Sequence, residues 1–165
     1  MQRIWAPWRM TYLEGEQGID PCFLCRLGAE RGNDGLVVWR GRLVYALLNA
    51  YPYASGHVLV APYAHVGDML ELPDETLHEL VAAVRMIVAA LDSEYAPQGF
   101  NLGANLGGAA GAGHAEHLHV HVVPRWRGDT NFMTVTGHAR VLPEALERTA
   151  ERLRRAIAQN QETSA

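Results

Sequence analysis

Three histidines alternate with aliphatic residues in the segment HLHVHVV, residues 117–123. In a β-strand successive side chains point to opposite faces of the sheet, so the imidazoles of His117, His119 and His121 would share one face. Histidine binds metal ions as neutral imidazole, and near neutral pH it also acts as a nucleophile or as a general acid and base. The Cα atoms of the outer two histidines would lie ~13 Å apart, so the three rings are not easily gathered around one ion. The spacing therefore predicts a divided site in which the histidines do different chemistry.

The segment PCFLC contains Cys22 and Cys25, the only two cysteines of the chain. Their two-residue spacing lets both sulfur atoms reach one metal ion from a tight turn, which makes half of a metal site. Three other interpretations compete with this one. The pair could be a redox motif like that of thioredoxins, which would have a strand before it and a helix after it, or a disulfide, or two buried free thiols. The spacing alone leaves these alternatives open.

The composition indicates one globular domain over residues 1–165, because a chain of 165 residues that is 48% hydrophobic can bury a substantial core. A formal net charge of -4 provides no large basic field. This charge disfavours nucleic acid as a partner, although a few local donors could still bind a small polyphosphate. All 14 basic residues are arginine, which excludes a lysine-based mechanism.

The first ten residues, MQRIWAPWRM, include charged residues and proline but no apolar core of signal-peptide length, so export is not indicated. The longest apolar stretch, LVAAVRMIVAAL, is interrupted by Arg85 and is too short to span a bilayer. We therefore expect a cytoplasmic protein with no membrane partner.

The pattern of apolar and turn-forming residues predicts an α+β fold with a mostly antiparallel five-stranded sheet and two main helices. Glycine-rich residues 109–116 are expected to form a loop whose backbone amides can approach a ligand. The expected strands cover residues 35–41, 42–50, 57–62, 99–108 and 117–123. The expected helices run from Pro73 to about Tyr95 and from Pro143 to about Ala158, and the charged residues of the second helix look mainly solvated.

The alternating histidines, together with the upstream segment NAYPYASGHVLVAPYAH, resemble the histidine triad (HIT) family over roughly residues 20–125. The flanking segments IWAPWRMTYL and VVPRWRGDTNFMTV are similar to a bacterial branch related to diadenosine tetraphosphate phosphorylases and hydrolases. The resemblance implies a HIT-like fold and a homodimer in which two sheets pair edge to edge. It divides the chain into an N-terminal arm (1–20), a core (20–125) and a C-terminal extension (126–165).

The resemblance also implies a mechanism in which the central histidine attacks the α-phosphorus of a nucleotide and forms a covalent nucleotidyl-histidine. His119 matches that position, His121 matches the residue that binds the α-phosphate, and His57 matches the residue that supports the cluster from the adjacent strand. Asn49 matches the position that binds the ribose, although a structural asparagine at a strand end would look the same. Asn105 matches an amide near the phosphates if the following loop has one extra residue.

One departure from the family pattern lies immediately before the triad. Many family members have GQ or GQS there, where side chains touch phosphate and assist the leaving group, whereas this chain has GAGHAEH. Gly113 and His114 are therefore expected to line the substrate site, and His114 could assist the leaving group. A loop histidine that is simply solvated is the alternative.

Some family members, and the related uridylyltransferases, complete a zinc site with the histidine after the proline turn and the first histidine of the triad. The resemblance thus implies a structural zinc ion held by Cys22, Cys25, His65 and His117. Four protein ligands leave no open position for water activation.

The implied substrates are dinucleoside polyphosphates or related nucleotide conjugates, and the sequence does not choose among hydrolysis, phosphorolysis and transfer. Two alternatives remain open from the sequence. The first is a nucleotide-binding or sensing module with little catalysis. The second is a hydrolase in which His117 and His119 bind a catalytic metal, and its activity would be lost with a chelator.

Overall fold

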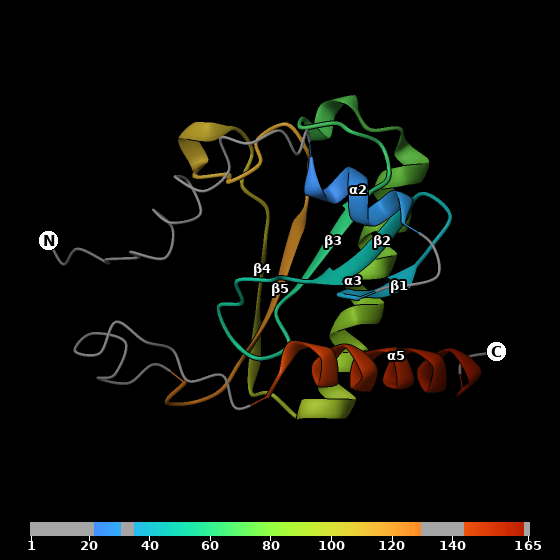
Figure 1. Ribbon diagram of the computed structural model, residues 1–165, viewed down its shortest axis with the longest axis vertical. Coiled ribbons are helices and arrows are strands. Elements are labelled where there is room, and N and C mark those ends of the chain that lie inside the picture. The colour runs from blue at the N-terminus through green and yellow to red at the C-terminus, as the bar shows by residue number, and fades with distance from the viewer. Residues whose placement is uncertain (1–21, 31–34, 130–143, 164–165) are drawn as a thin grey trace, which may run out of the picture.

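The computed structural model describes residues 22–30, 35–129 and 144–163. A five-stranded antiparallel sheet with the strand order β1-β2-β3-β5-β4 forms its centre (Figure 1). The sequence-based prediction of fold class is confirmed. The strands are β1 (Val37–Arg40), β2 (Val44–Leu48), β3 (Val58–Pro62), β4 (Gly99–Gly103) and β5 (Val120–Arg125).

The register of the strands explains where the histidine-bearing strand begins. Strand β3 ends at Pro62, which has no backbone N–H to continue a ladder. Its partner β5 is paired only from Val120, which lies opposite Val60. The strand expected over residues 117–123 therefore starts three residues later, and His117 and His119 lie in the segment that leads into it. Similarly, β4 ends at Gly103 and is shorter than expected.

Two of the helices correspond to the expected ones. Helix α3 (Asp74–Tyr95) follows Pro73 and has Asp74 and Glu75 in its first turn, where negative charge favours a helix N-terminus. Helix α5 (Leu146–Thr163) starts later than expected and continues beyond Ala158. Pro143, where its start was expected, lies outside the described residues, as does the segment FMTVTG. Two short 3-10 helices, η1 (Met69–Glu71) and η2 (Gly108–Ala110), complete the described elements together with α2.

Helix α2 (Phe23–Ala29) was not expected from the sequence. It has only seven residues, which is too short for a clear helical period. Tertiary contacts stabilise it, because Leu24 is fully buried against the sheet and its carbonyl oxygen accepts a 2.6 Å hydrogen bond from the Tyr45 hydroxyl. Arg40 donates further hydrogen bonds to carbonyl oxygens at the C-terminal end of the helix.

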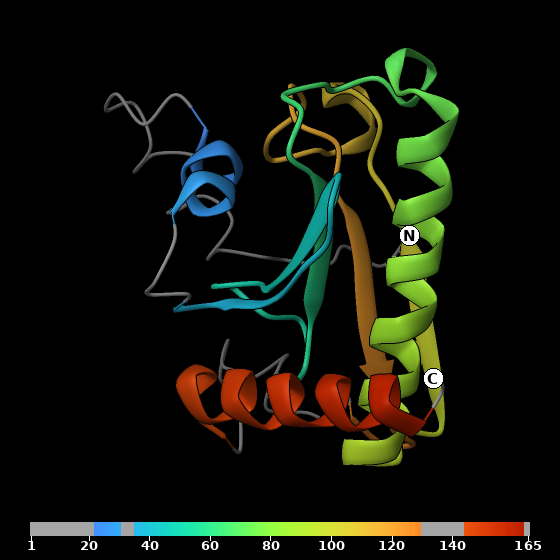
Figure 2. The ribbon, with the colours of Figure 1, turned by 90° about the vertical axis from the view of Figure 1, so that its right-hand side faces the viewer.

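The sheet is covered on both faces. Figure 2 shows it between α2 on one side and α3 on the other, with α5 crossing one end of α3. Residues of β2 and β3 alternate between two apolar clusters, so both strands are buried throughout. On the α3 side, Val44, Ala46, Leu48, Val58 and Val60 pack with Leu80, Ile87, Leu91 and Leu153, and on the α2 side Tyr45, Leu47, Leu59 and Ala61 pack with Leu24. Among the described residues, no helix has the length and apolar character needed to cross a membrane.

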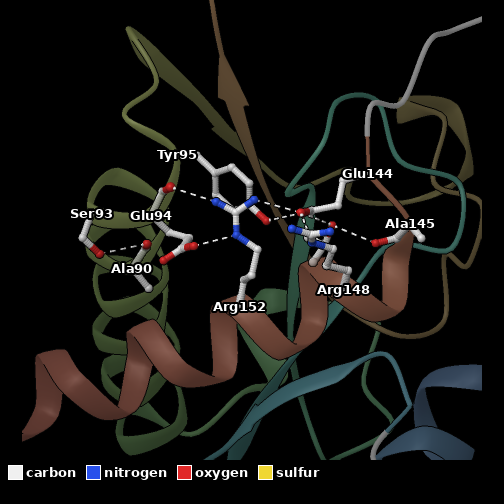
Figure 3. A network of polar contacts seen from close by, with 9 residues as sticks. Ala90, Ser93, Glu94, Tyr95, Glu144, Ala145, Arg148 and Arg152 are labelled. Atoms are coloured by element: carbon white, nitrogen blue, oxygen red, sulfur yellow. Dashed lines mark hydrogen bonds and ion pairs between the residues drawn. The ribbon is translucent and has the colours of Figure 1, made fainter.

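Most charged residues of α5 are exposed, as expected, and Arg152 and Arg154 are the exceptions among the described residues. Arg152 is half-buried and forms ion pairs with Glu94 of α3 (2.6 Å) and with Glu144 (2.8 Å), and its guanidinium lies 4.4 Å from the centre of the Tyr95 ring (Figure 3). Glu144 also accepts hydrogen bonds from the hydroxyls of Tyr95 (2.7 Å) and Thr149 (2.9 Å). Burial raises the pKa of Glu144, but these donors outweigh it and hold that pKa below its usual value. The network fixes the start of α5 to the end of α3.

The two edges of the sheet differ. At the β1 edge, the Arg154 guanidinium from α5 donates to the carbonyl oxygens of Val37 (2.8 Å) and Gly35 (2.6 Å). At the other edge, Asn101, Leu102 and Gly103 of β4 are exposed. An arginine on strand carbonyls hinders further pairing at β1, and β4 is the more exposed of the two edge strands.

Candidate functional site

His119 lies at the end of the extended segment that leads into β5, on the face of the sheet opposite α3. Its Nδ1 atom is 2.9 Å from the backbone carbonyl oxygen of His117. A carbonyl oxygen only accepts hydrogen bonds, so Nδ1 carries the proton and Nε2 keeps its lone pair. Burial lowers the pKa of His119, mainly because the charged ring would lose its hydration. The ring is therefore a neutral imidazole with a fixed tautomer, as nucleophilic attack requires.

His57 and His121 form a hydrogen-bonded pair beside His119. Nε2 of the fully buried His57 lies 2.9 Å from Nδ1 of His121. The centres of the His119 and His121 rings are 5.0 Å apart. The structure therefore brings together the three histidines that the sequence assigned to catalysis, although their roles remain to be tested.

The loop between β2 and β3 positions His57. The backbone N–H of Asn49 donates to the carbonyl oxygen of His57 (2.9 Å), which closes the loop. Gly56 has a φ of 78° and lies so near Leu91 that a Cβ atom would be 2.9 Å from it, so only glycine fits this position. The Asn49 side chain accepts a 2.9 Å hydrogen bond from the backbone N–H of Tyr51, and its amide nitrogen is 3.4 Å from Nδ1 of His57. Asn49 thus has a structural function in this loop, whereas its binding to ribose remains a prediction.

The glycine-rich loop between β4 and β5 contains the other expected substrate-binding residues. Asn105 is half-buried, Gly113 is exposed, and His114 is half-buried with its ring edge-on to Phe23 of α2, at 4.7 Å between ring centres. Gly67 fits closely beneath this loop, because a Cβ atom there would clash with the carbonyl oxygen of Ala115. The loop is therefore held from two sides, and the interpretation of His114 as simply solvated does not fit its position.

The four predicted metal ligands converge on one point. The sulfur and nitrogen donors of Cys22, Cys25, His65 and His117 all lie within 4.8 Å of one another. The Cys22 sulfur is 3.2 Å from Nδ1 of His117, and the Cys25 sulfur is 3.3 Å from Nδ1 of His65. Tetrahedral zinc, with bonds of about 2.3 Å to sulfur and about 2.0 Å to nitrogen, would separate such ligands by about 3.5 Å. The donor set and its spacing therefore fit a zinc ion.

The surrounding residues orient these ligands. Nε2 of His117 donates to the carbonyl oxygen of Pro62 (2.9 Å), which leaves Nδ1 as the metal-binding atom. Cys22 is the residue before the first turn of α2 and Cys25 lies within that turn, so both sulfurs point the same way. Burial raises the pKa of the Cys25 thiol and lowers the pKa of His117. Metal binding would therefore release thiol protons.

One feature agrees with the thioredoxin-like alternative, because a helix does begin at the cysteine pair. However, that motif does not account for His65 and His117, whose nitrogens face the two sulfurs. A metal site explains all four side chains.

Sequence reasoning missed three residues that act around the site. The backbone N–H of Tyr53 donates to Nδ1 of His57 (3.1 Å), Phe23 packs on His114, and Arg40 binds the end of α2. The role of a backbone amide does not depend on residue type, so no sequence pattern reveals it. The contacts of Phe23 with His114 and of Arg40 with α2 join distant parts of the chain, and neither has a recognisable spacing. For Arg40, the one signal in the sequence is its place in the strand that follows the predicted metal-binding segment.

Comparison with known proteins identifies the family. The model of the HIT domain matches residues 30–128. The AP-4-A phosphorylase of Mycobacterium tuberculosis is 44% identical over 157 residues, which cover 90% of this chain and 80% of that protein. The bis(5'-nucleosyl)-tetraphosphatase [asymmetrical] of Schizosaccharomyces pombe is 32% identical over 93 residues, or 56% of this chain and 50% of that protein.

A similar solved structure supports the same assignment. The Zn-bound histidine triad family protein from Mycobacterium smegmatis has a TM-score of 0.71 and 28% sequence identity, and the match covers 87% of this chain and 97% of that one. The family model covers residues 30–128, and the rings of His57, His119 and His121 lie side by side. This chain belongs to the HIT family.

Proposed function

We propose that this protein is an enzyme that cleaves dinucleoside polyphosphates, such as diadenosine tetraphosphate, through a covalent nucleotidyl intermediate on His119. Two relatives support this substrate class, since one is named AP-4-A phosphorylase and the other bis(5'-nucleosyl)-tetraphosphatase. The observation that carries the proposal is the 2.9 Å hydrogen bond from Nδ1 of His119 to the His117 carbonyl oxygen. It leaves the Nε2 lone pair of a buried, neutral ring available for attack on phosphorus.

The proposed reaction has two displacements at the same phosphorus. In the first, Nε2 of His119 forms a P–N bond to the α-phosphorus while the bond to the bridging oxygen breaks, so that ATP leaves from diadenosine tetraphosphate. In the second, an acceptor oxygen attacks and the P–N bond breaks. Inorganic phosphate as the acceptor gives ADP, and water gives AMP. The 44% identity to an AP-4-A phosphorylase favours phosphate.

The remaining site residues are proposed to hold the substrate. His121 would donate a hydrogen bond to the α-phosphate, supported by His57, and a fixed donor there stabilises the charge that is redistributed during transfer. Asn49 would contact the ribose. Asn105, Gly113 and His114 would contact the phosphates from the glycine-rich loop, and His114 could protonate the leaving group.

We also propose that Cys22, Cys25, His65 and His117 hold a structural zinc ion. The convergence of the donor atoms supports this, and so does the Zn-bound relative from Mycobacterium smegmatis. The ion would supply no reactive water, because four protein ligands fill its coordination sphere. A catalytic metal shared by His117 and His119 is disfavoured, because Nδ1 of His119 is hydrogen-bonded to a carbonyl oxygen while Nδ1 of His117 faces the two cysteines. Free thiols used as ligands also fit the expected cytoplasmic location.

Product analysis tests the proposed reaction. The purified protein is incubated with diadenosine tetraphosphate, with and without inorganic phosphate, and the nucleotides are separated. We expect ADP and ATP, formed only when phosphate is present. AMP and ATP in both conditions would instead identify a hydrolase. The absence of any turnover would contradict the proposal and favour a nucleotide-binding module.

We further infer that two copies pair through β4. This edge exposes Leu102, whereas Arg154 occupies carbonyl oxygens at the β1 edge. Pairing of β4 with its copy would join two sheets and bury the exposed leucine. We expect a particle of twice the 18.2 kDa chain mass in light scattering, and a monomer for Leu102→Arg. Leu70→Arg is the matched control, because Leu70 is 91% exposed in η1, away from the sheet edge. A dimer that persists in Leu102→Arg would contradict pairing through β4.

A further inference from the structure

The hydrogen bonds around His57 have a definite direction. The backbone N–H of Tyr53 donates to Nδ1 of His57 at 3.1 Å, and the side-chain amide nitrogen of Asn49 lies 3.4 Å from the same atom. A backbone amide can only donate. Asn49 also presents its amide nitrogen here, because its oxygen already accepts from the backbone N–H of Tyr51. Nδ1 of His57 must therefore be the unprotonated nitrogen of the ring.

The tautomer of His57 determines the tautomer of His121. A neutral imidazole has one donor and one acceptor nitrogen, so Nε2 of His57 carries the hydrogen. It donates across 2.9 Å to Nδ1 of His121. Nδ1 of His121 is then the acceptor of its own ring, and the hydrogen of His121 must be on Nε2. The backbone N–H of Tyr53 thus determines, through His57, which nitrogen of His121 is the donor.

We propose that the backbone amide of Tyr53, assisted by the Asn49 side chain, is the positioning group that makes Nε2 of His121 a hydrogen-bond donor to a phosphate oxygen of the substrate. The choice of phosphate as the acceptor rests on the proposed function, whereas the tautomers do not. Asn49 then has a function in addition to the expected contact with ribose. Its removal would affect the histidine pair even in the absence of a nucleotide.

Burial and packing protect the hydrogen bonds of His57 from competition by water. His57 is fully buried, so water does not compete for its nitrogens. The Tyr53 ring covers the pair, with its centre 4.6 Å from that of His57 and 5.9 Å from that of His121. Because His57 is fully buried, reversal of both tautomers would leave the Tyr53 N–H facing another N–H without water to compensate, which is unfavourable.

The tautomer of His121 complements that of His119, the proposed nucleophile. His119 carries its hydrogen on Nδ1 and presents the lone pair of Nε2, while His121, with a ring centre 5.0 Å away, presents N–H at Nε2. One ring can therefore attack phosphorus while the adjacent ring donates to a phosphate oxygen. Backbone groups, the His117 carbonyl and the Tyr53 amide, fix the tautomers of both.

The tautomers can be measured directly in the full-length protein without substrate. The chain is labelled with ¹⁵N-histidine, and two-bond ¹H–¹⁵N correlations are recorded at about pH 8, where imidazoles are neutral. We expect Nε2–H for His57 and His121 and Nδ1–H for His119. Nδ1–H at His121 would overturn the proposal while leaving the role of His119 untouched. Conversely, loss of the covalent mechanism would leave these tautomer assignments unaffected.

Two variants at one position isolate the amide. Tyr53→Ala removes the ring but keeps the N–H, and Tyr53→Pro removes both. We expect the tautomers of Tyr53→Ala to match those of the wild type. Tyr53→Pro should populate Nδ1–H at His57, with kcat about tenfold below that of Tyr53→Ala and a similar KM, since one ordering hydrogen bond is lost. Unchanged tautomers in folded Tyr53→Pro would overturn the proposal.

Asn49→Ala provides an independent test should Tyr53→Pro fail to fold. We expect Asn49→Ala to shift the His57 resonances without nucleotide and to lower kcat as well as raise KM. A change in KM alone, with resonances identical to the wild type, would assign Asn49 to the ribose only. Nδ1–H at His57 in the wild type would overturn the assigned role of the Tyr53 amide whatever the variants do.

Discussion

We expect cleavage of diadenosine tetraphosphate to fall by about 10⁴-fold or more when His119 is replaced by alanine, because the variant has no nucleophile to form the P–N bond. The measurement is the steady-state rate of ATP release, with phosphate at saturation. The side chains that bind the proposed metal do not include His119, so zinc content and the circular dichroism spectrum are expected to match the wild type. Loss of activity with an intact fold would thus separate chemistry from structure.

His78→Ala is the matched control for this variant. His78 is exposed on α3, on the opposite side of the sheet from the triad, so its removal should leave the rate within about twofold of the wild type. Trapping the intermediate adds a second test, because the P–N bond of a phosphoramidate is cleaved by acid but survives alkali. Denaturing the wild type at alkaline pH with labelled substrate should therefore leave nucleotide attached to His119. A His119→Ala variant with wild-type activity would contradict the proposed mechanism.

Replacing Cys22 with serine is expected to remove zinc and to lower the free energy of unfolding by about 3–5 kcal/mol. Serine is nearly the same size as cysteine and is a better residue at the N-terminal cap of a helix. Any loss of stability therefore comes from the lost metal ligand and not from α2 itself. Zinc content by elemental analysis and thermal unfolding, each with and without chelator, provide the measurement.

Activity distinguishes a structural from a catalytic ion in the same samples. With a structural ion, the rate per folded molecule should stay constant while the folded fraction decreases on chelation. If the chelator abolishes activity in protein that remains folded, the ion takes part in the chemistry. A metal-free protein with an unchanged melting temperature would exclude the proposed zinc site.

The parts of the site that sequence could predict are those fixed by residue type and short spacing. Alternation predicted Leu118 and Val122 for the core and His119 and His121 for the opposite face, and the core contains Leu118 although it lies before the start of β5. The metal cluster could be assembled from sequence only through the family resemblance. Cys22 and His117 are 95 positions apart, and no periodic relation connects them.

Other features depended on contacts that a sequence does not encode locally. Helix α2 is too short to be recognised by its own pattern and is stabilised by Tyr45 and Arg40. Most charged residues of α5 are exposed, as helical charge patterns usually are, but Arg152 forms ion pairs with two carboxylates on separate segments, which the local pattern does not indicate. The start of β5 was set by Pro62, a residue of a different strand.

The distance along the chain between Cys22 and His117 also affects how the protein folds. A metal bound to both would close a loop of 95 residues, which in a chain-entropy model restricts the unfolded state by about 4–5 kcal/mol. Helix α2, with seven residues, has little stability of its own. Without metal it would open as an independent unit, and its amide hydrogens would exchange long before those of β2 and β3. With metal bound, α2 and the central strands would open together, so an occupied cluster would set the size of the cooperative folding unit.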